Sequence, residues 1–222
     1  MKSQALRAIC LAGLLGAGGA QAQVGVSADF GTTGVGAHLS VPLQSNINLR
    51  FGANYLNYSY DSHTSDVDYD FKLKLRTVDA LLDYFFTPGA WRLSAGLVYN
   101  GNRVDAHGKP NVNGSYTING NVYLASTAGT IEGKIDFRNA APYLGIGWGN
   151  GAQRPGWSFV GDLGVLFQGS PDTSLANQGC SAPAPVCARL ANDVATENNS
   201  LADKAHDFKI YPVLRVGANY RF

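Results

Sequence analysis

Eight charged residues stand at polar positions of segments in which apolar and polar residues alternate. They are four acids and four arginines, namely Asp29, Asp79, Asp83, Asp162, Arg50, Arg92, Arg215 and Arg221. If the apolar positions face lipid, the charged side chains point into a β-barrel. Two arrangements are then open. The charges pair into a salt-bridged plug, because an unpaired buried charge is costly, or they line a narrow path for a charged or zwitterionic solute.

A histidine and a serine, His38 and Ser40, share one face of a predicted strand, and Asp29 lies on a neighbouring segment. In a Ser–His–acid group the histidine activates the serine and the acid fixes the histidine tautomer. A spacing of two residues on one strand is a weak signal for such a site. A hydrogen-bonded histidine in the lumen accounts for it equally well, so we add His38 to the lumen candidates and predict no catalytic site.

A second charged set alternates with apolar residues near the predicted external rim. It comprises Lys72, Lys74, Arg76, Glu132, Lys134, Asp136 and Arg138. These side chains form either a charged vestibule that gathers solutes or the solvated wall of strands that extend above the membrane. His63, His107 and His206 are too scattered to predict a metal site. We predict no cofactor.

The first 22 residues have the features of a cleaved signal peptide. Lys2 and Arg7 supply positive charge before the apolar run 8–20, and Ala20-Gln21-Ala22 offers a small-x-small cleavage pattern. The run is too short and too rich in glycine for a transmembrane helix, which needs about 20 apolar residues. We therefore expect an exported chain whose mature part, 23–222, is a single domain.

Two cysteines, Cys180 and Cys187, remain once Cys10 leaves with the signal peptide. In an oxidising exported compartment we expect them to form a disulfide that closes a short loop. A metal site is the alternative, but no histidine or further cysteine lies close to them in the sequence.

From residue 24 onward the hydrophobic pattern has a period of two. In the last segment Leu214, Val216 and Tyr220 alternate with polar residues up to the C-terminal Phe222, as in a membrane-spanning barrel strand. The 17 Lys+Arg nearly balance the 16 Asp+Glu, which argues against a nucleic-acid-binding protein. We predict an all-β fold, an antiparallel transmembrane β-barrel.

Both chain ends of such a barrel should lie in the periplasm, so the number of crossings must be even. We predict eight: 24–30, 32–42, 46–60, 66–86, 90–105, 130–150, 156–170 and 207–222. The alternative at the N-terminus is one long first strand over 24–42. A slip in the alternation between Leu75 and Val78 predicts a β-bulge.

Short turns alternate along the chain with long polar stretches, which we take as external loops near 60–66, 105–129 and 171–206. We expect a hairpin at 117–123, where Asn119-Gly120 favours a tight turn, and a helical stretch at 192–207. Aromatic residues gather beside the short turns, as in a periplasmic girdle. They are Tyr84, Phe85, Phe86, Trp91, Trp148, Trp157, Tyr220 and Phe222.

Four runs of the mature chain resemble, in the same order, the CarO-type outer-membrane proteins. They are GTTGVG (31–36), APYLGIG (141–147), GDLGV (161–165) and YPVLRVG (211–217). The resemblance implies a small barrel linked to uptake of ornithine and other basic amino acids, and to carbapenem entry. The glycine-rich strands are shared more widely, with OmpW-like and OmpA-like barrels. The external loops and their cysteine pair depart from the family pattern, and no site residue is carried over.

These observations together predict a Gram-negative outer-membrane protein that acts as a narrow porin for small solutes such as basic amino acids. The first alternative is a non-conducting barrel that works through its external loops, and the second is a lipid-modifying barrel enzyme. The expected partners are outer-membrane lipid and the barrel-assembly machinery. The closing strand with Tyr220 and Phe222 resembles the segment that this machinery recognises.

Overall fold

The computed structural model describes residues 24–63, 68–86, 90–150, 152 and 155–222; the predicted signal peptide lies outside these ranges. Eight antiparallel strands form a closed ring, because β4 pairs with β5 as well as with β3. In ring order they are β1 (Gly25–Gly31), β2 (Gly34–Gln44), β3 (Ile47–His63), β4 (Asp68–Phe85), β5 (Trp91–Asn100), β10 (Ala140–Trp148), β11 (Gly156–Phe167) and β13 (Ile210–Arg221). The predicted β-barrel is confirmed, and its first strand is separate from the second.

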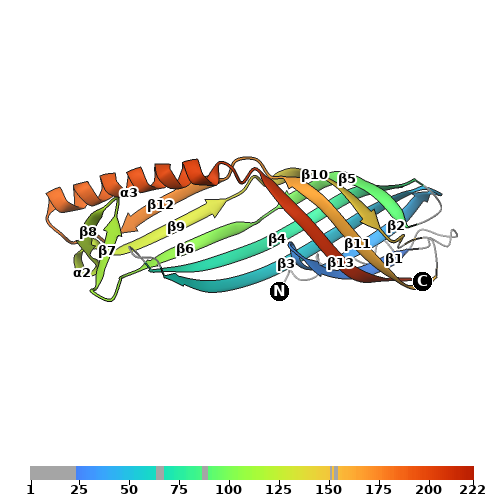
Figure 1. Cartoon of the computed structure of the whole chain (residues 1–222), viewed down its shortest axis with the longest axis horizontal. Coiled ribbons are helices and arrows are strands. Elements are labelled where there is room, and N and C mark those ends of the chain that lie inside the picture. Colours follow the sequence, from blue (N-terminus) through green and yellow to red (C-terminus); the bar gives the residue numbers. More distant parts are fainter. Residues whose placement is uncertain (1–23, 64–67, 87–89, 151, 153–154) are drawn as a thin grey trace, which may run out of the picture.

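The remaining elements form an extension at the long-loop end of the barrel (Figure 1). They are β6 (Arg103–Lys109), β7 (Ser115–Ile118), β8 (Asn121–Leu124), α2 (Ala125–Ala128), β9 (Thr130–Asp136), β12 (Asp172–Gln178) and α3 (Ala184–Ala205). Strands β6, β9 and β12 continue the sheet in the order β4–β6–β9–β12, β7 and β8 form a separate two-stranded sheet, and α3 packs along β12. The two longest predicted loops are therefore largely folded. Among the described helices, none is long and apolar enough to cross a membrane.

The hairpin predicted at 117–123 is present as β7 and β8. Its turn residues Asn119 and Gly120 both have positive φ, 50° and 75°, as a two-residue hairpin turn of the mirror-image type requires. The predicted helical stretch is also present. It begins earlier than expected, since α3 starts at Ala184, and Pro185 lies in its first turn, where the fixed φ of proline suits a helix start.

Two predicted crossings, 90–105 and 130–150, are each divided in two. The first ends as β5 and resumes as β6, and the second is divided between β9 and β10. At this break, the backbone N–H of Asn100 donates to the carbonyl of Asn139 (2.7 Å), and the side-chain oxygen of Asn102 accepts from the N–H of Arg76 (3.0 Å). The break is where β4 exchanges one neighbour for another, pairing with β5 over 77–85 and with β6 over 68–74.

The polarity of the two sheet faces reverses across the break. In the ring, outward side chains such as Val78 and Leu82 are apolar and inward ones such as Asp79 are polar. In the extension, Leu73 continues the inward face and lies opposite Val104, while Lys74 continues the outward face. An outward face is apolar where it meets lipid and charged where it meets water, so the reversal is consistent with the membrane boundary.

This reversal explains why the predicted bulge between Leu75 and Val78 is wrong. The β3–β4 register runs without a shift from Ile47↔Tyr84 to His63↔Asp68. The apolar pattern changes phase because the apolar face changes sides, with the backbone pairing unbroken. The register shift that the structure does contain lies between β2 and β3, at Pro42 and Gln44.

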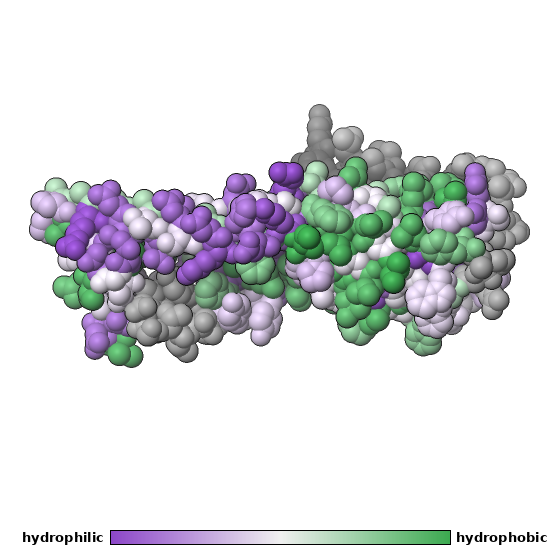
Figure 2. All heavy atoms as spheres, turned by 45° about the horizontal axis from the view of Figure 1, so that its top comes forward, coloured by the Kyte–Doolittle hydropathy of each residue, from purple (hydrophilic) through white to green (hydrophobic). Residues whose placement is uncertain are grey.

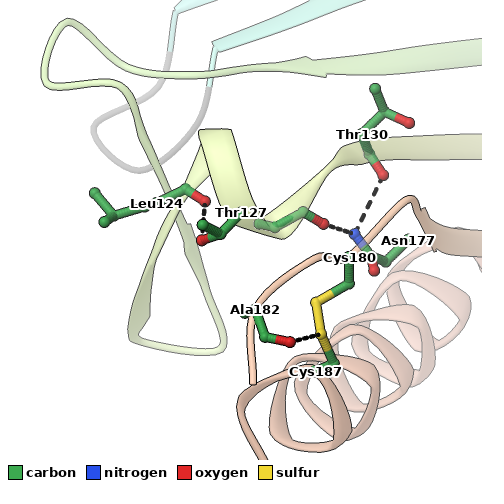
Figure 3. Close-up of a disulfide and its surroundings, with 8 residues drawn as sticks. Leu124, Thr127, Thr130, Asn177, Cys180, Ala182 and Cys187 are labelled. Carbon is green, nitrogen blue, oxygen red and sulfur yellow. Dashed lines mark hydrogen bonds between the residues drawn. A yellow bond between two sulfur atoms is a disulfide. The ribbon is translucent and has the colours of Figure 1, made fainter. Parts of the chain in front are cut away.

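The extension has its own small core, formed by Tyr116, Ile118, Tyr123, Ala128, Ile131, Leu190 and Val194. The Cys180–Cys187 disulfide, with a Cα–Cα distance of 6.0 Å, ties the start of α3 to the segment after β12 and confirms the predicted pair. Close by, the Asn177 side chain donates to the carbonyls of Ala128 (2.6 Å) and Thr130 (3.3 Å) (Figure 3).

Apolar side chains cover the outside of the barrel, whereas the extension is largely polar on the face that Figure 2 shows. At the short-turn end the aromatic residues cluster as predicted: the Tyr220 ring lies 5.2 Å from Trp157 and 5.2 Å from Phe222, centroid to centroid. Phe85 is the exception, because its side chain is buried in the barrel interior. The girdle and the apolar band match those of membrane barrels.

Asp193 of α3 forms hydrogen bonds with the β7–β8 hairpin. It is buried and accepts hydrogen bonds from the side chains of Asn119 (3.1 Å), Asn121 (2.9 Å) and Tyr123. The hydrogen bond from Tyr123, followed by that from Asn119, lowers the pKa of Asp193. Since the folded-state pKa is depressed, the contact stabilises the extension above the ordinary carboxyl pKa of about 4 and is lost as pH falls through the lowered value.

We predict that Asp193→Ala accelerates hydrogen exchange of the hairpin amides about tenfold at pH 7, because hydrogen bonds to a carboxylate are strong. Hydrogen–deuterium exchange measured by mass spectrometry over 115–124 checks this. The matched control is Asp203→Ala, which removes an exposed carboxylate from the same helix. The difference from wild type should shrink at acidic pH; an equal difference at pH 7 and pH 2 would contradict the role of the ionised carboxylate.

Candidate functional site

All nine side chains predicted to line the lumen are buried in the barrel interior, each 7% exposed or less. They are Asp29, His38, Arg50, Asp79, Asp83, Arg92, Asp162, Arg215 and Arg221. They come from seven of the eight ring strands, since β10 contributes none. Inward alternation on each strand turns them toward one another, so residues far apart in sequence meet inside the ring.

The Arg50 network consists of Arg50, Asp83, Arg92, Ser94 and Asp162. Asp162 bridges two arginines, accepting from Nη1 of Arg50 at 2.9 Å and from Nη2 of Arg92 at 2.8 Å. Asp83 accepts from Nη2 of Arg50 at 3.1 Å and from the hydroxyl of Ser94 at 2.5 Å. Arg92 also donates to the backbone carbonyls of residues 148 and 149. Two positive and two negative groups therefore neutralise each other.

The His38 network consists of Asp29, His38, Asn54, Asp79 and Arg215. Nδ1 of His38 lies 2.6 Å from Asp29 and Nε2 lies 3.2 Å from Asp79. Asp79 is also 3.3 Å from Nη2 of Arg215 and accepts from the amide of Asn54 at 3.3 Å. A carboxylate thus lies at each ring nitrogen of His38.

This arrangement differs from a Ser–His–acid group, in which the serine lies at one ring nitrogen and the acid at the other. Ser40 is buried in the same interior. Among the hydrogen bonds of the described residues, those of the His38 ring go to Asp29, Asp79 and Arg215, not to Ser40. The geometry favours His38 as part of the charge network.

Arg221 belongs to neither network. Its guanidinium is buried near the short-turn end, and its Nε and Nη1 atoms have no hydrogen-bond partner in the part of the chain that the structure describes.

An apolar cluster lies in the same interior, on the long-loop side of the charged residues along β5, β11 and β13. Its buried members are Leu81, Val98, Ala141, Tyr143, Leu166 and Val213. The space beside the Arg50 network is a cavity of about 10 Å³, roughly the volume that one water molecule needs. Around the Arg50 network the interior is therefore filled by side chains, as in the plug arrangement.

Inward-facing glycines make room for the large polar side chains. A Cβ on Gly52 would lie 1.9 Å from Cδ2 of His38, and one on Gly147 would lie 2.7 Å from Cζ of Arg92. A Cβ on either Gly145 or Gly164 would lie 2.4 Å from the hydroxyl oxygen of Tyr143. The sequence reasoning missed this role, although glycine at inward positions of an alternating strand is the pattern that could have indicated it.

The predicted vestibule residues lie on the outward face of the sheet or on its connections. Lys74, Arg76, Asp136 and Arg138 line a cavity of about 500 Å³ at the break between barrel and extension, whereas Lys72, Glu132 and Lys134 do not. Several of the set are paired: Lys74 lies 2.6 Å from Asp105, and Lys134 lies 2.5 Å from Asp136. Burial raises the pKa of Asp105, but the hydrogen bond from Lys74 and nearby positive charges outweigh it and lower that pKa. The solvated-wall alternative describes this placement better than an inward vestibule does.

We predict that Gly52→Ala lowers the folded fraction, because the added methyl group clashes with His38; overpacking of this kind costs about 1–3 kcal/mol. The fraction that shifts mobility on a gel without boiling measures folding. Gly161→Ala is the matched control, since the nearest atom to its Cβ would be the carbonyl oxygen of Arg215 at 3.7 Å. Equal folding of the two variants would show that the interior around His38 is not tightly packed.

No family model and no curated protein matches the chain. Among solved structures, it is similar to CarO of Acinetobacter baumannii, at 23% identity and a TM-score of 0.58 over 90% of this chain and 98% of that one. CarO2 of the same organism matches at 22% identity and a TM-score of 0.56, over 90% of this chain and 99% of the other. At these identities the likeness concerns the fold. The sequence motifs of the strands predicted this likeness. The chain has the fold of the CarO outer-membrane β-barrels.

Proposed function

We propose that the protein is an outer-membrane barrel that is closed to solutes in this conformation and works through its external extension. The observation that carries this proposal is the filled interior: two charge networks, an apolar cluster and a remaining cavity of about 10 Å³. Export by removal of residues 1–22, and insertion through the closing strand with Tyr220 and Phe222, belong to the same proposal.

The energetics of the Arg50 network support a closed interior. A continuous path past Asp162 would separate its carboxylate from Arg50 or Arg92. Breaking a buried ion pair on one side costs about 3–5 kcal/mol, because it leaves an uncompensated charge. At that cost a conformation with an opened network is a minor fraction of the population.

The extension offers a surface for binding. Beside the disulfide is an apolar cavity of about 280 Å³ between the hairpin and α3. Val122, Leu124 and Val186 line it and are exposed by 68%, 60% and 41%. Apolar side chains exposed together on a folded extramembrane element are typical of binding surfaces. This exposed apolar surface favours the interpretation in which the protein acts by binding a partner through its external extension.

A narrow channel for small solutes such as basic amino acids is the second candidate. The interior holds four carboxylates: Asp79, Asp83 and Asp162 each lie within contact distance of an arginine, and Asp29 lies within contact distance of His38. The ammonium or guanidinium group of a basic amino acid has the chemistry to replace such a partner. A channel of this kind requires the networks to rearrange during passage.

Conductance in a planar bilayer separates the two candidates. We predict no discrete openings from folded, inserted wild-type protein, because the paired side chains of the two networks occupy the interior. The matched variant is Arg50→Ser with Asp162→Ser, which removes one charge of each sign and leaves Asp83 beside Arg92, 3.7 Å apart. This variant should show small openings.

The contrary result is equally specific. Wild-type openings that ornithine or arginine blocks would overturn the closed-barrel proposal and support the channel. Migration of the unboiled protein on a gel confirms that each sample is folded before it is added to the bilayer.

A further inference from the structure

We propose that the outward cavity at the break between barrel and extension binds the phosphorylated headgroup of a membrane lipid. This cavity, of about 500 Å³, has four cationic residues in its lining, Lys74, Arg76, Arg103 and Arg138, against two acidic ones, Asp136 and Asp172. The inference goes beyond the closed barrel and its extension, and it requires only that the barrel spans a membrane.

The charged residues that line the cavity along β4, β6 and β9 lie on the outward side of the sheet. Arg76 lies on the outward face of β4, two residues before the exposed Val78. Lys74 is two residues further along the same face, and the residues opposite it in the sheet are Arg103 and then Asp136. Directly opposed residues of antiparallel strands project to the same side. The charged lining therefore faces outward, away from the filled interior.

Two of the four cations are available for an anion. Lys74 and Arg103 contact the same carboxylate, that of Asp105, at 2.6 Å and 3.1 Å. In the described part of the chain, Arg76 and Arg138 have no carboxylate within ion-pair distance, and both are exposed. The local charge is thus positive at these two guanidinium groups.

Arg76 is placed at the upper edge of the apolar band. Its guanidinium lies 5.5 Å from the ring centroid of Tyr55, an outward aromatic residue. Tyr99 and Leu97, also outward and exposed, lie next to the break on β5. Tyrosines at this level are typical of the membrane–water interface, where lipid headgroups lie.

The chemistry at this edge suits a phosphate. Guanidinium groups bind phosphate through paired hydrogen bonds, and lysine adds a point charge. Basic pockets beside membrane segments are a general means of binding phosphorylated headgroups. A soluble phosphate ester would use the same groups, so the source of the phosphate has to be distinguished by experiment.

Native mass spectrometry of the detergent-purified full chain, with bisphosphorylated lipid A as the probe, tests the proposal. Wild type should retain the lipid, and Arg76→Gln with Arg138→Gln should bind it about tenfold more weakly, since hydrogen bonds to charged groups are lost. The matched control is Lys204→Gln with Lys209→Gln, which removes two exposed positive charges outside the cavity. Arg138→Gln alone serves as a second variant, and unboiled gel migration verifies folding.

The outcomes are distinct. Weakened binding in the arginine variants alone, with unchanged retention of zwitterionic phosphatidylethanolamine, supports the site. Equal lipid A binding by wild type and both arginine variants overturns it. If inorganic phosphate displaces lipid A at concentrations similar to that of the lipid itself, the cavity serves a soluble phosphate and the lipid assignment is overturned. None of these results depends on conductance, so they are independent of the closed-barrel proposal.

Discussion

Charges enclosed in a narrow ring must neutralise each other, and much of this structure follows from that requirement. An eight-stranded barrel is just wide enough to be filled by its own side chains. Asp162 therefore meets Arg50 and Arg92, and Asp79 meets His38 and Arg215. The long guanidinium side chains need space, which the inward glycines provide. Inward glycines such as Gly52 and Gly147 are thus a consequence of this polar interior.

Two strands join the barrel to its extension. β3 and β4 stay paired in one register from the short-turn end to the far end, while their apolar face changes sides at the break. In lipid the outward face is apolar, and in the extension apolar residues such as Leu73 lie on the inward face. The same two strands thus have apolar outward residues in the membrane and charged outward residues in water. The interruption at Asn100 and Asn102 is where the neighbours of β4 are exchanged.

The sequence was most informative where one physical rule acted alone. Strict alternation predicted the barrel and the inward position of residues such as Arg50, because lipid and lumen impose one pattern on every strand. The count of eight crossings also required that the number of crossings be even. Alternation could not predict which charges pair, since Arg50 and Asp162 are 112 residues apart. The predicted bulge near Leu75 was wrong. The apolar residues move there from the outward to the inward face, and in the sequence this change of face has the same pattern as a bulge. The role of Gly52 was missed because glycine has no side chain that would show which residue it packs against. The role becomes visible only from the position of its neighbour, His38.

The unbroken β3–β4 ladder also has a mechanical meaning. At about 3.4 Å per residue, the 18 residues of β4 reach roughly 60 Å, whereas a tilted barrel strand needs about 9–11 residues to cross the membrane. About half of the strand lies beyond the ring, since β4 pairs with β5 over 77–85 and with β6 over 68–74. A lateral load on the distal helix and hairpin acts on the wall of the barrel through a long lever arm. The extension and the membrane segment are consequently coupled mechanically through one continuous pair of strands.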